Sequence, residues 1–357
     1  MKKNFRIYPP NTPNDGILFV DHQKTDRSGH MGHALVEYAP GKILAFYPSC
    51  SSEDMTWHGH SGYGWMEYKR SVDGGESWSE PIIEPNSKAL FDQNIGRTFM
   101  CEKAVVTDSG RIVLFYLCCD MITNGHIWEP YFEPYFATSE DGGESFSPAK
   151  MLFNKRGRVY DAIYRDGVIY VLFCSDPTPG KEHSAAPEYL LYVSIDNGES
   201  FTLCSALPFS TTFNNFYGTM CFTPSGDLLA YTYEQTDEFN LQYLCSRDNG
   251  ITWSKEQRAH FKNRLRNPQL VYFKDRFFMH GRGGDGNLYG SLILYSSYDG
   301  VNWDDGRLLR RVSAGCGAYS NNLVLHLPDG RERLMIQSSH AYEANKTNII
   351  MFFVDID

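Results

Sequence analysis

Short apolar runs separated by polar turns recur along the whole chain, which is the pattern of β-strands rather than of amphipathic helices. Six times, an apolar run is followed by a turn rich in Gly, Asp or Pro and then by a second apolar run. These six hairpins span residues 33–46, 103–115, 161–172, 219–230, 269–279 and 322–335. Because helical periodicity is nearly absent between them, the pattern predicts an all-β protein.

A second element repeats downstream of five of the hairpins. It reads Ser-x-Asp-x-Gly-x-x-aromatic in copies that begin at Ser71, Ser139, Ser194 and Ser246, and a copy one residue shorter begins at Ser297. Successive copies begin 68, 55, 52 and 51 residues apart. Asp accepts hydrogen bonds from the backbone of its own turn and Gly supplies a positive φ. The element therefore predicts a structural turn between the third and fourth strands of a repeating four-stranded unit, and we assign no catalysis to it.

Repeats of this period are typical of propellers and solenoids. The element is the Asp box, or BNR repeat, and residues 17–355 resemble the sialidase superfamily of six-bladed β-propellers. The resemblance implies one propeller domain over residues 1–357, built from four-stranded antiparallel blades. The predicted blades begin near residues 30, 97, 158, 214, 264 and 317. The sixth hairpin has no Asp box after it, so we expect a strand near the N-terminus, at residues 16–20, to complete that blade and close the ring.

Composition narrows the functional classes. The chain has 357 residues, a net charge of −10 and 15% aromatic residues. This composition is that of a folded chain, and the acidic balance disfavours broad contacts with nucleic-acid phosphates. No apolar stretch is long enough to span a membrane. We expect no organic cofactor, because no Gly-rich phosphate-binding loop lies between a strand and a helix. The oligomeric state is not predicted.

Cysteine use and the first residues bear on location. The nine cysteines are an odd number, and Cys118 and Cys119 are adjacent. This pattern favours a reducing compartment over a disulfide framework. No apolar run follows the lysines at the start of the sequence, as it would in a signal peptide. We therefore predict a cytoplasmic protein.

The repeat also predicts where a site would form. In a propeller, the starts of the innermost strands and the loops between the second and third strands open on one mouth of the central channel. These positions are rich in Arg, His, Asn, Tyr and acidic residues, whereas the strands that follow are apolar. Buried charge is costly unless it is paired, so this density favours a pocket for an anionic or hydroxyl-rich ligand. The predicted substrate-binding residues are His30, Arg97, Glu102, Arg158, Asp161, Asn215, Tyr217, Arg266, Asn267, Arg282 and His340.

The resemblance to sialidases implies catalytic roles. In that family three arginines hold the substrate carboxylate, a Tyr activated by a Glu attacks the anomeric carbon, and an Asp of the blade-one loop is the acid/base. Tyr319, followed by Ser320, matches the nucleophile position at the start of blade six, and Glu234 matches the activating Glu in blade four. Arg266 and Arg282 match carboxylate-binding arginines, for which a planar guanidinium is well suited.

Blade one departs from the family pattern. The family places Arg-Ile-Pro just before Ala-Leu, but here Met31 occupies the arginine position, and Arg6 lies 65 residues before the first Asp box. Histidines are enriched instead, and His30 also lies at the start of this blade. Imidazole titrates near neutral pH and suits proton transfer. The predicted acid/base candidates of this blade are His33, His58, His60 and Asp54.

Other histidines receive other assignments. We predict no metal site, because no Cys or acidic cluster accompanies the His-x-His pair at a spacing that would identify one. His22 and His260 lie outside the positions that face the mouth, and we predict both at the surface.

Three functions remain open from the sequence. The first is a sialidase-like glycoside hydrolase that cleaves a glycosidic bond in a small, acidic glycan. The second is a lyase that uses His and Tyr for β-elimination on a uronate and forms an unsaturated product that absorbs ultraviolet light. The third is a sugar-binding propeller without catalysis. In each case the expected partner is a small molecule or oligosaccharide, and neither a nucleic acid nor a membrane.

Overall fold

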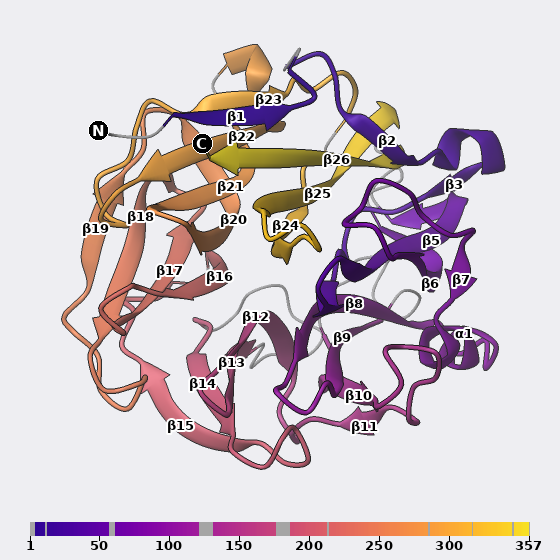
Figure 1. The fold of residues 1–357 in the computed structure, drawn as a ribbon, viewed down its shortest axis with the longest axis horizontal. Helices are drawn as coiled ribbons and strands as arrows, with labels where there is room; N and C mark the ends of the chain where they lie inside the picture. Colours follow the sequence, from indigo (N-terminus) through magenta and orange to yellow (C-terminus); the bar gives the residue numbers. More distant parts are fainter. Residues whose placement is uncertain are drawn as a thin grey trace.

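Six antiparallel sheets stand around a central axis like the blades of a propeller (Figure 1). The computed structural model describes residues 4–10, 13–56, 61–120, 131–175, 186–212, 214–284, 286–315, 317–344 and 346–356, without the side chains of 53–56, 61, 62 and 120. None of the helices in these ranges has the length or apolar character that crossing a bilayer requires. The predicted all-β class and the six-bladed architecture are both confirmed.

Blades two to five share one plan, in which four strands run from the axis to the rim in chain order. Blade two contains β8 (Arg97–Val106), β9 (Ile112–Asp120), β10 (Tyr135–Ser139) and β11 (Lys150–Met151). Blade three contains β12 (Gly157–Arg165), β13 (Val168–Ser175), β14 (Tyr189–Ser194) and β15 (Thr202–Leu207). Blade four contains β16 (Asn215–Phe222), β17 (Leu228–Glu234), β18 (Asp237–Ser246) and β19 (Gln257–His260). Blade five contains β20 (Arg264–Phe273), β21 (Arg276–Gly284), β22 (Ser291–Ser297) and β23 (Arg307–Arg310).

Blade one is built on two long strands. Its strands are β3 (Arg27–Ser28), β4 (Leu35–Ala39), β5 (Lys42–Thr56), β6 (Ser61–Ser71) and β7 (Ile82–Ile83). The helix α1 (Pro85–Phe91) leads from this blade to blade two, and two single-turn 3-10 helices, η1 (His22–Thr25) and η2 (Gly286–Leu288), lie elsewhere. The innermost strands of the six blades begin at Leu35, Arg97, Gly157, Asn215, Arg264 and Ser320.

Blade six closes the ring with N-terminal strands. It contains β24 (Ser320–His326), β25 (Glu332–Glu343) and β26 (Lys346–Ile356), and both β1 (Phe5–Tyr8) and β2 (Ile17–Val20) pair with β26. The prediction of an N-terminal outer strand is confirmed for β2, but it missed β1. The long β26 has room for both, because β1 pairs with its last residues and β2 with residues 349–351. Arg6 therefore lies on the outer edge of the ring.

The Asp boxes connect the third and fourth strands of blades one to five, as predicted. In the second box, Ser139 Oγ donates to Asp141 Oδ1 at 2.8 Å and accepts the Gly143 N–H at 2.8 Å. Asp141 Oδ1 also accepts the Ser145 N–H at 2.9 Å. Gly143 has φ +80°, and a Cβ there would lie 2.4 Å from Leu44 Cδ1 on the neighbouring blade. Glycine is therefore required both by the turn and by the packing of adjacent blades.

Candidate functional site

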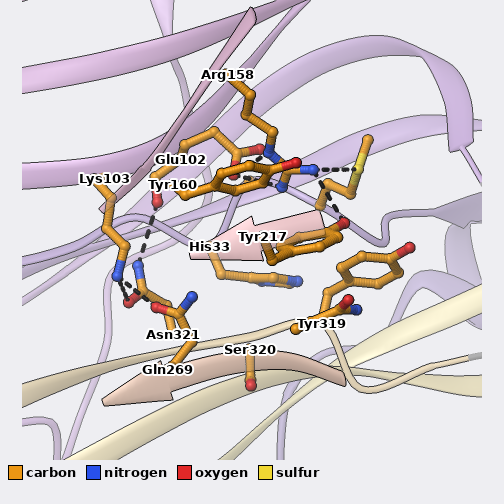
Figure 2. Close-up of a pocket in the computed structure, with 13 residues that line it drawn as sticks. His33, Glu102, Lys103, Arg158, Tyr160, Tyr217, Gln269, Tyr319, Ser320 and Asn321 are labelled. Carbon is orange, nitrogen blue, oxygen red and sulfur yellow. Dashed lines mark hydrogen bonds and ion pairs between the residues drawn. The ribbon is translucent and has the colours of Figure 1, made fainter. Parts of the chain in front are cut away.

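Irregularities in the inner strands form the site. The strand register shifts at one level in blades two to five, and the residues at the shifts are Glu102, Tyr160, Tyr217 and Asn267. A β-bulge turns a side chain out of the regular alternation of a strand. All four side chains line one cavity around the axis, which we call the cup. The cup is lined by Met31, Gly32, His33, Glu102, Lys103, Arg158, Tyr160, Tyr217, Asn267, Gln269, Tyr319, Ser320 and Asn321 (Figure 2).

Backbone strain accompanies these irregularities. Tyr217, Asn267 and Ala318 have φ values of 54°, 53° and 62°, in the left-handed region that side chains disfavour. Such conformations cost on the order of 1–3 kcal/mol each and cluster where geometry serves function. All three positions belong to or directly precede the wall of the cup.

The cup is narrow. Its volume of about 30 Å³ has room for roughly two water molecules. A space of this size admits one functional group of a ligand. Two buried polar atoms of the lining residues, Glu102 Oε1 and Asn267 Nδ2, have no hydrogen-bond partner in the part of the chain that is described.

Arg158 occupies one wall of the cup together with Glu102. Its Nη2 donates to Glu102 Oε2 at 2.7 Å, and its Nη1 donates to the Tyr217 hydroxyl at 3.0 Å (Figure 2). Met31 Sδ lies 3.6 Å from the same Nη1, so the residue in the family's arginine position does line the site. Burial raises the pKa of Glu102 above its ordinary value, although Arg158 opposes the rise. The charge of Arg158 is therefore already balanced within the protein.

Lys103 closes the floor of the cup. Its Nζ lies 3.1 Å from Asp161 Oδ1, 2.5 Å from Gln269 Oε1 and 2.7 Å from Asn321 Oδ1. The other oxygen of Asp161 accepts from Thr219 Oγ1 and from the backbone N–H of the next residue, both at 2.8 Å. Asp161 was predicted to bind substrate, but its oxygens instead join blades two, three and four.

Tyr319 forms the opposite wall. Its side chain is 5% exposed, and the Arg282 guanidinium lies 5.1 Å from its ring centroid. The rings of His30 and Tyr217 lie 5.7 and 6.0 Å from it. Ser339 accepts the Tyr319 N–H through Oγ at 3.2 Å and donates its own N–H to the Tyr319 carbonyl at 2.9 Å. The backbone of Tyr319 is thus fixed while its side chain faces the cup.

A second arginine system adjoins this wall. Arg266 Nε lies 3.2 Å from Glu238 Oε1 and 3.3 Å from the Tyr233 hydroxyl, and its Nη1 donates to the Tyr289 hydroxyl at 2.6 Å. Burial raises the pKa of Tyr233 to about 12, an effect that Arg266 and Arg282 oppose. Burial also raises the pKa of Glu238, which is 8% exposed.

Two glutamates of blade four, Glu234 and Glu238, are candidates for the residue that activates Tyr319. Glu234 accepts from Thr212 Oγ1 at 3.1 Å and does not line the cup. Glu238 stands across the same turn, beside Arg266, and was not selected from the sequence. The strand register distinguishes the two glutamates. Glu234 pairs with Asp237, and successive residues of a strand point to opposite faces, so Glu238 projects to the face opposite Asp237.

His33 lines the cup with both ring nitrogens engaged. The Gln337 amide donates to Nδ1 at 3.2 Å, so the proton resides on Nε2, which donates to the His30 carbonyl at 2.6 Å. Burial lowers the pKa of His33 to about 4. These contacts describe a neutral, structural imidazole. Asp54, His58 and His60, the other acid/base candidates, have side chains outside the described residues.

Three further predicted residues, Arg97, Asn215 and His340, lie away from the cup. The Arg97 guanidinium stacks 3.9 Å from the Phe132 ring centroid. The Asn215 amide accepts the Thr212 N–H and donates to Gln242, at 2.6 and 2.5 Å. His340 borders a separate cavity. Around the cup itself, the described residues include no group of three or more His, Cys, Asp or Glu that could hold a metal ion.

The two histidines predicted at the surface differ. His260 is exposed, as predicted. The prediction for His22 is wrong, because it is only 2% exposed and its Nδ1 bonds the Thr347 carbonyl at 2.9 Å. That bond joins the N-terminal segment to β26, a contact between residues 325 positions apart that no local pattern indicates.

Comparisons with known proteins support the same fold. The BNR/Asp-box repeat model matches residues 244–255. No curated protein matches the chain. A protein of unknown function from Dyadobacter fermentans superposes with a TM-score of 0.73 at 14% identity, covering 99% of both chains. The NanB sialidase of Streptococcus pneumoniae gives 0.66 at 12% identity, with 98% of this chain and 72% of the other covered. The Hadza microbial sialidase Hz136 gives 0.68 at 16%, with 96% and 68% covered.

These similarities establish the class of protein. The chain has the fold seen in the sialidase structures, with Asp boxes and six antiparallel blades, four of which have four strands and two of which have five. At such identities the likeness extends to the fold alone.

Proposed function

We propose that the chain is a carbohydrate-active enzyme that cleaves a glycosidic bond in a small, acidic glycan at the mouth of the cup. The observation that carries this proposal is the position of Tyr319, which lines the cup and lies beneath the Arg282 guanidinium at 5.1 Å. A tyrosine can serve as nucleophile toward an anionic sugar without like-charge repulsion, as in sialidases. A nearby guanidinium attracts the ligand's carboxylate.

The balance of charge sets the kind of ligand. Arg158, Arg266 and Lys103 each contact a carboxylate, namely Glu102, Glu238 and Asp161. The guanidinium of Arg282 lies beside Tyr319. A guanidinium in this position suits a ligand whose carboxylate lies near Tyr319. Glu102 Oε1 and Asn267 Nδ2, an acceptor and a donor without partners among the described residues, suit ligand hydroxyl groups.

In the proposed reaction, the Tyr319 oxygen gives its proton to the activating glutamate and attacks the anomeric carbon while the bond to the leaving oxygen breaks. The leaving oxygen takes a proton from an acid of the blade-one loop, for which Asp54, His58 and His60 remain the candidates. Water then attacks the same carbon and releases Tyr319, with a proton returning to that acid. The same glutamate returns the proton when Tyr319 is released. We assign the activation of Tyr319 to Glu238 in preference to Glu234, because only Glu238 joins the Arg266 and Tyr233 system.

A panel of acidic oligosaccharides, followed by reducing-end release and by ultraviolet absorbance, tests the proposal. Tyr319→Phe is expected to lower kcat at least about 100-fold while ligand affinity changes little. Glu238→Gln is expected to lower kcat, whereas the matched Glu234→Gln leaves it near the wild-type value. An ultraviolet-absorbing product would indicate the lyase instead. Binding without turnover, unaffected by Tyr319→Phe, would indicate a sugar-binding propeller.

A further inference from the structure

Each lysine or arginine that lines the cup already contacts a carboxylate of the protein. Arg158 Nη2 donates to Glu102 Oε2 at 2.7 Å, and Lys103 Nζ lies 3.1 Å from Asp161 Oδ1. The arginine that the family places in blade one is replaced by Met31, which also lines the cup. A ligand carboxylate in the cup would compete with a protein carboxylate for each cation, so this cavity is better suited to a neutral group.

Two polar atoms of the lining, Glu102 Oε1 and Asn267 Nδ2, are buried and have no hydrogen-bond partner among the residues that the structure describes. The second polar atom of each side chain is engaged. Glu102 Oε2 accepts from Arg158, and Asn267 Oδ1 accepts from the Tyr233 hydroxyl at 3.3 Å. A buried polar group without a partner costs free energy, which a ligand recovers when it supplies the missing hydrogen bond.

The two atoms come from opposite sides of the ring. Glu102 lies on β8 of blade two and Asn267 lies on β20 of blade five, and these blades stand across the axis from each other (Figure 1). Both residues stand at shifts of the strand register, and they are only 9% and 2% exposed. The cup therefore has an unused acceptor on one side and an unused donor on the other.

A hydroxyl group satisfies both atoms, because it donates one hydrogen bond and accepts others. A carboxylate has no proton to donate to Glu102, and an ammonium group cannot accept from Asn267. The volume of the cup adds a limit of size. Room for roughly two water molecules admits a hydroxyl or hydroxymethyl group and excludes the larger N-acetyl group.

We propose that the cup is the specificity subsite for one neutral hydroxyl group of the sugar, which donates to Glu102 Oε1 and accepts from Asn267 Nδ2. The acidic group of the ligand then stays outside the cup, on the side of Arg282, which is not among the lining residues. The preferred substrate is an acidic sugar with a free hydroxyl or hydroxymethyl group, and no N-acyl group, at the position that enters the cup. The assignment to a substrate rests on the proposed function, whereas the preference of the cup for a hydroxyl does not.

Crystals soaked in ethylene glycol or in sodium acetate test the cup without any sugar. The two molecules have the same number of non-hydrogen atoms and are used at equal concentration. A hydroxyl of ethylene glycol should lie within hydrogen-bond distance of both Glu102 Oε1 and Asn267 Nδ2, whereas acetate should leave the cup to water. Acetate in the cup, or water alone in both crystals, would overturn the subsite.

Calorimetric titration tests the assignment to a sugar. D-glucuronate, D-galacturonate and N-acetylneuraminate are compared first, and the acid that binds most tightly is then titrated beside its monodeoxy analogues. One monodeoxy form should bind the wild type about 10- to 100-fold more weakly than the parent sugar does, because it leaves the buried pair of atoms without partners. Failure of all three acids to bind, or equal binding of every deoxy form, would overturn the sugar assignment and leave the crystal result standing.

A matched pair of variants locates the effect in the cup. Asn267→Gly removes the donor at a residue with φ 53°, which glycine adopts readily, and should bind the parent sugar and the discriminating deoxy form equally. Asn249→Gly makes the same change at φ 56° in an exposed Asp-box turn and should behave as the wild type does. Discrimination that persists in Asn267→Gly would overturn the role of Asn267. Because binding is measured without turnover, these results stand apart from the failure or success of the hydrolase proposal.

Discussion

The Asp-box turns and the cup present opposite ways of using polar side chains in one repeat. Each Asp box satisfies its hydrogen bonds within its own few residues, as Ser139 and Asp141 do, and the same bonds recur at Ser246 and Asp248. The cup differs at every blade, and its bonds join blades, as between Arg158 and Glu102 or Lys103 and Asn321. Positions that repeat therefore build the propeller, and positions that break the repeat build the site.

The largest effect is expected where a bond between blades balances a buried charge. Glu102→Ala leaves the Arg158 guanidinium, 3% exposed, without its carboxylate. Removing one partner of a buried ion pair costs about 3–5 kcal/mol. The free energy of unfolding, measured by urea titration with circular dichroism, should fall by that amount.

The matched control removes both charges. Glu102→Leu combined with Arg158→Met keeps the volume and should lose far less stability than Glu102→Ala, because no charge is left uncompensated. Equal losses in the single and double variants would show that the site depends on the packing of these side chains and not on their charges.

The next effect is a dependence of stability on pH that comes from the cup. Burial lowers the pKa of His33 to about 4, against 6.5 for an ordinary histidine. Between these values the unfolded chain binds a proton that the native protein does not. The contribution of His33 is therefore fully present above pH 6.5 and is lost as the pH falls toward 4, at up to about 1.4 kcal/mol per pH unit.

Urea titrations between pH 7 and pH 4 measure this slope. His33→Gln should make it shallower, since an amide does not titrate. His260→Gln, at an exposed histidine, should leave the slope unchanged. A slope that is the same in His33→Gln and the wild type would contradict the lowered pKa.

The repeat explains why the sequence predicted the fold so well. Asp boxes and Gly turns are local, so spacing along the chain was sufficient to count the blades. The side chains that line the cup were only partly predicted. Glu102, Arg158, Tyr217, Asn267 and Tyr319 do line it, because they lie within inner strands or directly before one.

The failures share a different cause. Glu238, the floor contacts of Lys103 and the burial of His22 depend on which strand residue faces which neighbour, and on bonds between segments far apart. Bulges change those faces by one residue, and no residue pattern marks them in advance. The sequence also does not indicate which charges pair across blades. Asp161 was therefore predicted to bind substrate, although its carboxylate forms an ion pair with Lys103.

The smallest effect is expected in an Asp-box turn. Asp141→Ala removes the carboxylate that accepts three hydrogen bonds within one exposed turn, while the other residues of the turn stay in place. A loss confined to one turn should lower the melting temperature by only about 1–3 °C and leave ligand affinity unchanged.

The pH at which stability is lost distinguishes this turn from the cup. The Ser145 hydroxyl, the Ser145 N–H and the Ser139 hydroxyl lower the pKa of Asp141 below its ordinary value of 3.8. A lowered carboxyl pKa gives stability that is present above pH 3.8 and is lost only as the pH falls below it. Asp141→Ala should therefore parallel the wild type from pH 7 to pH 4, where His33→Gln departs from it, and should differ in slope only under stronger acid. A changed slope above pH 4 would mean that the turns and the cup are coupled.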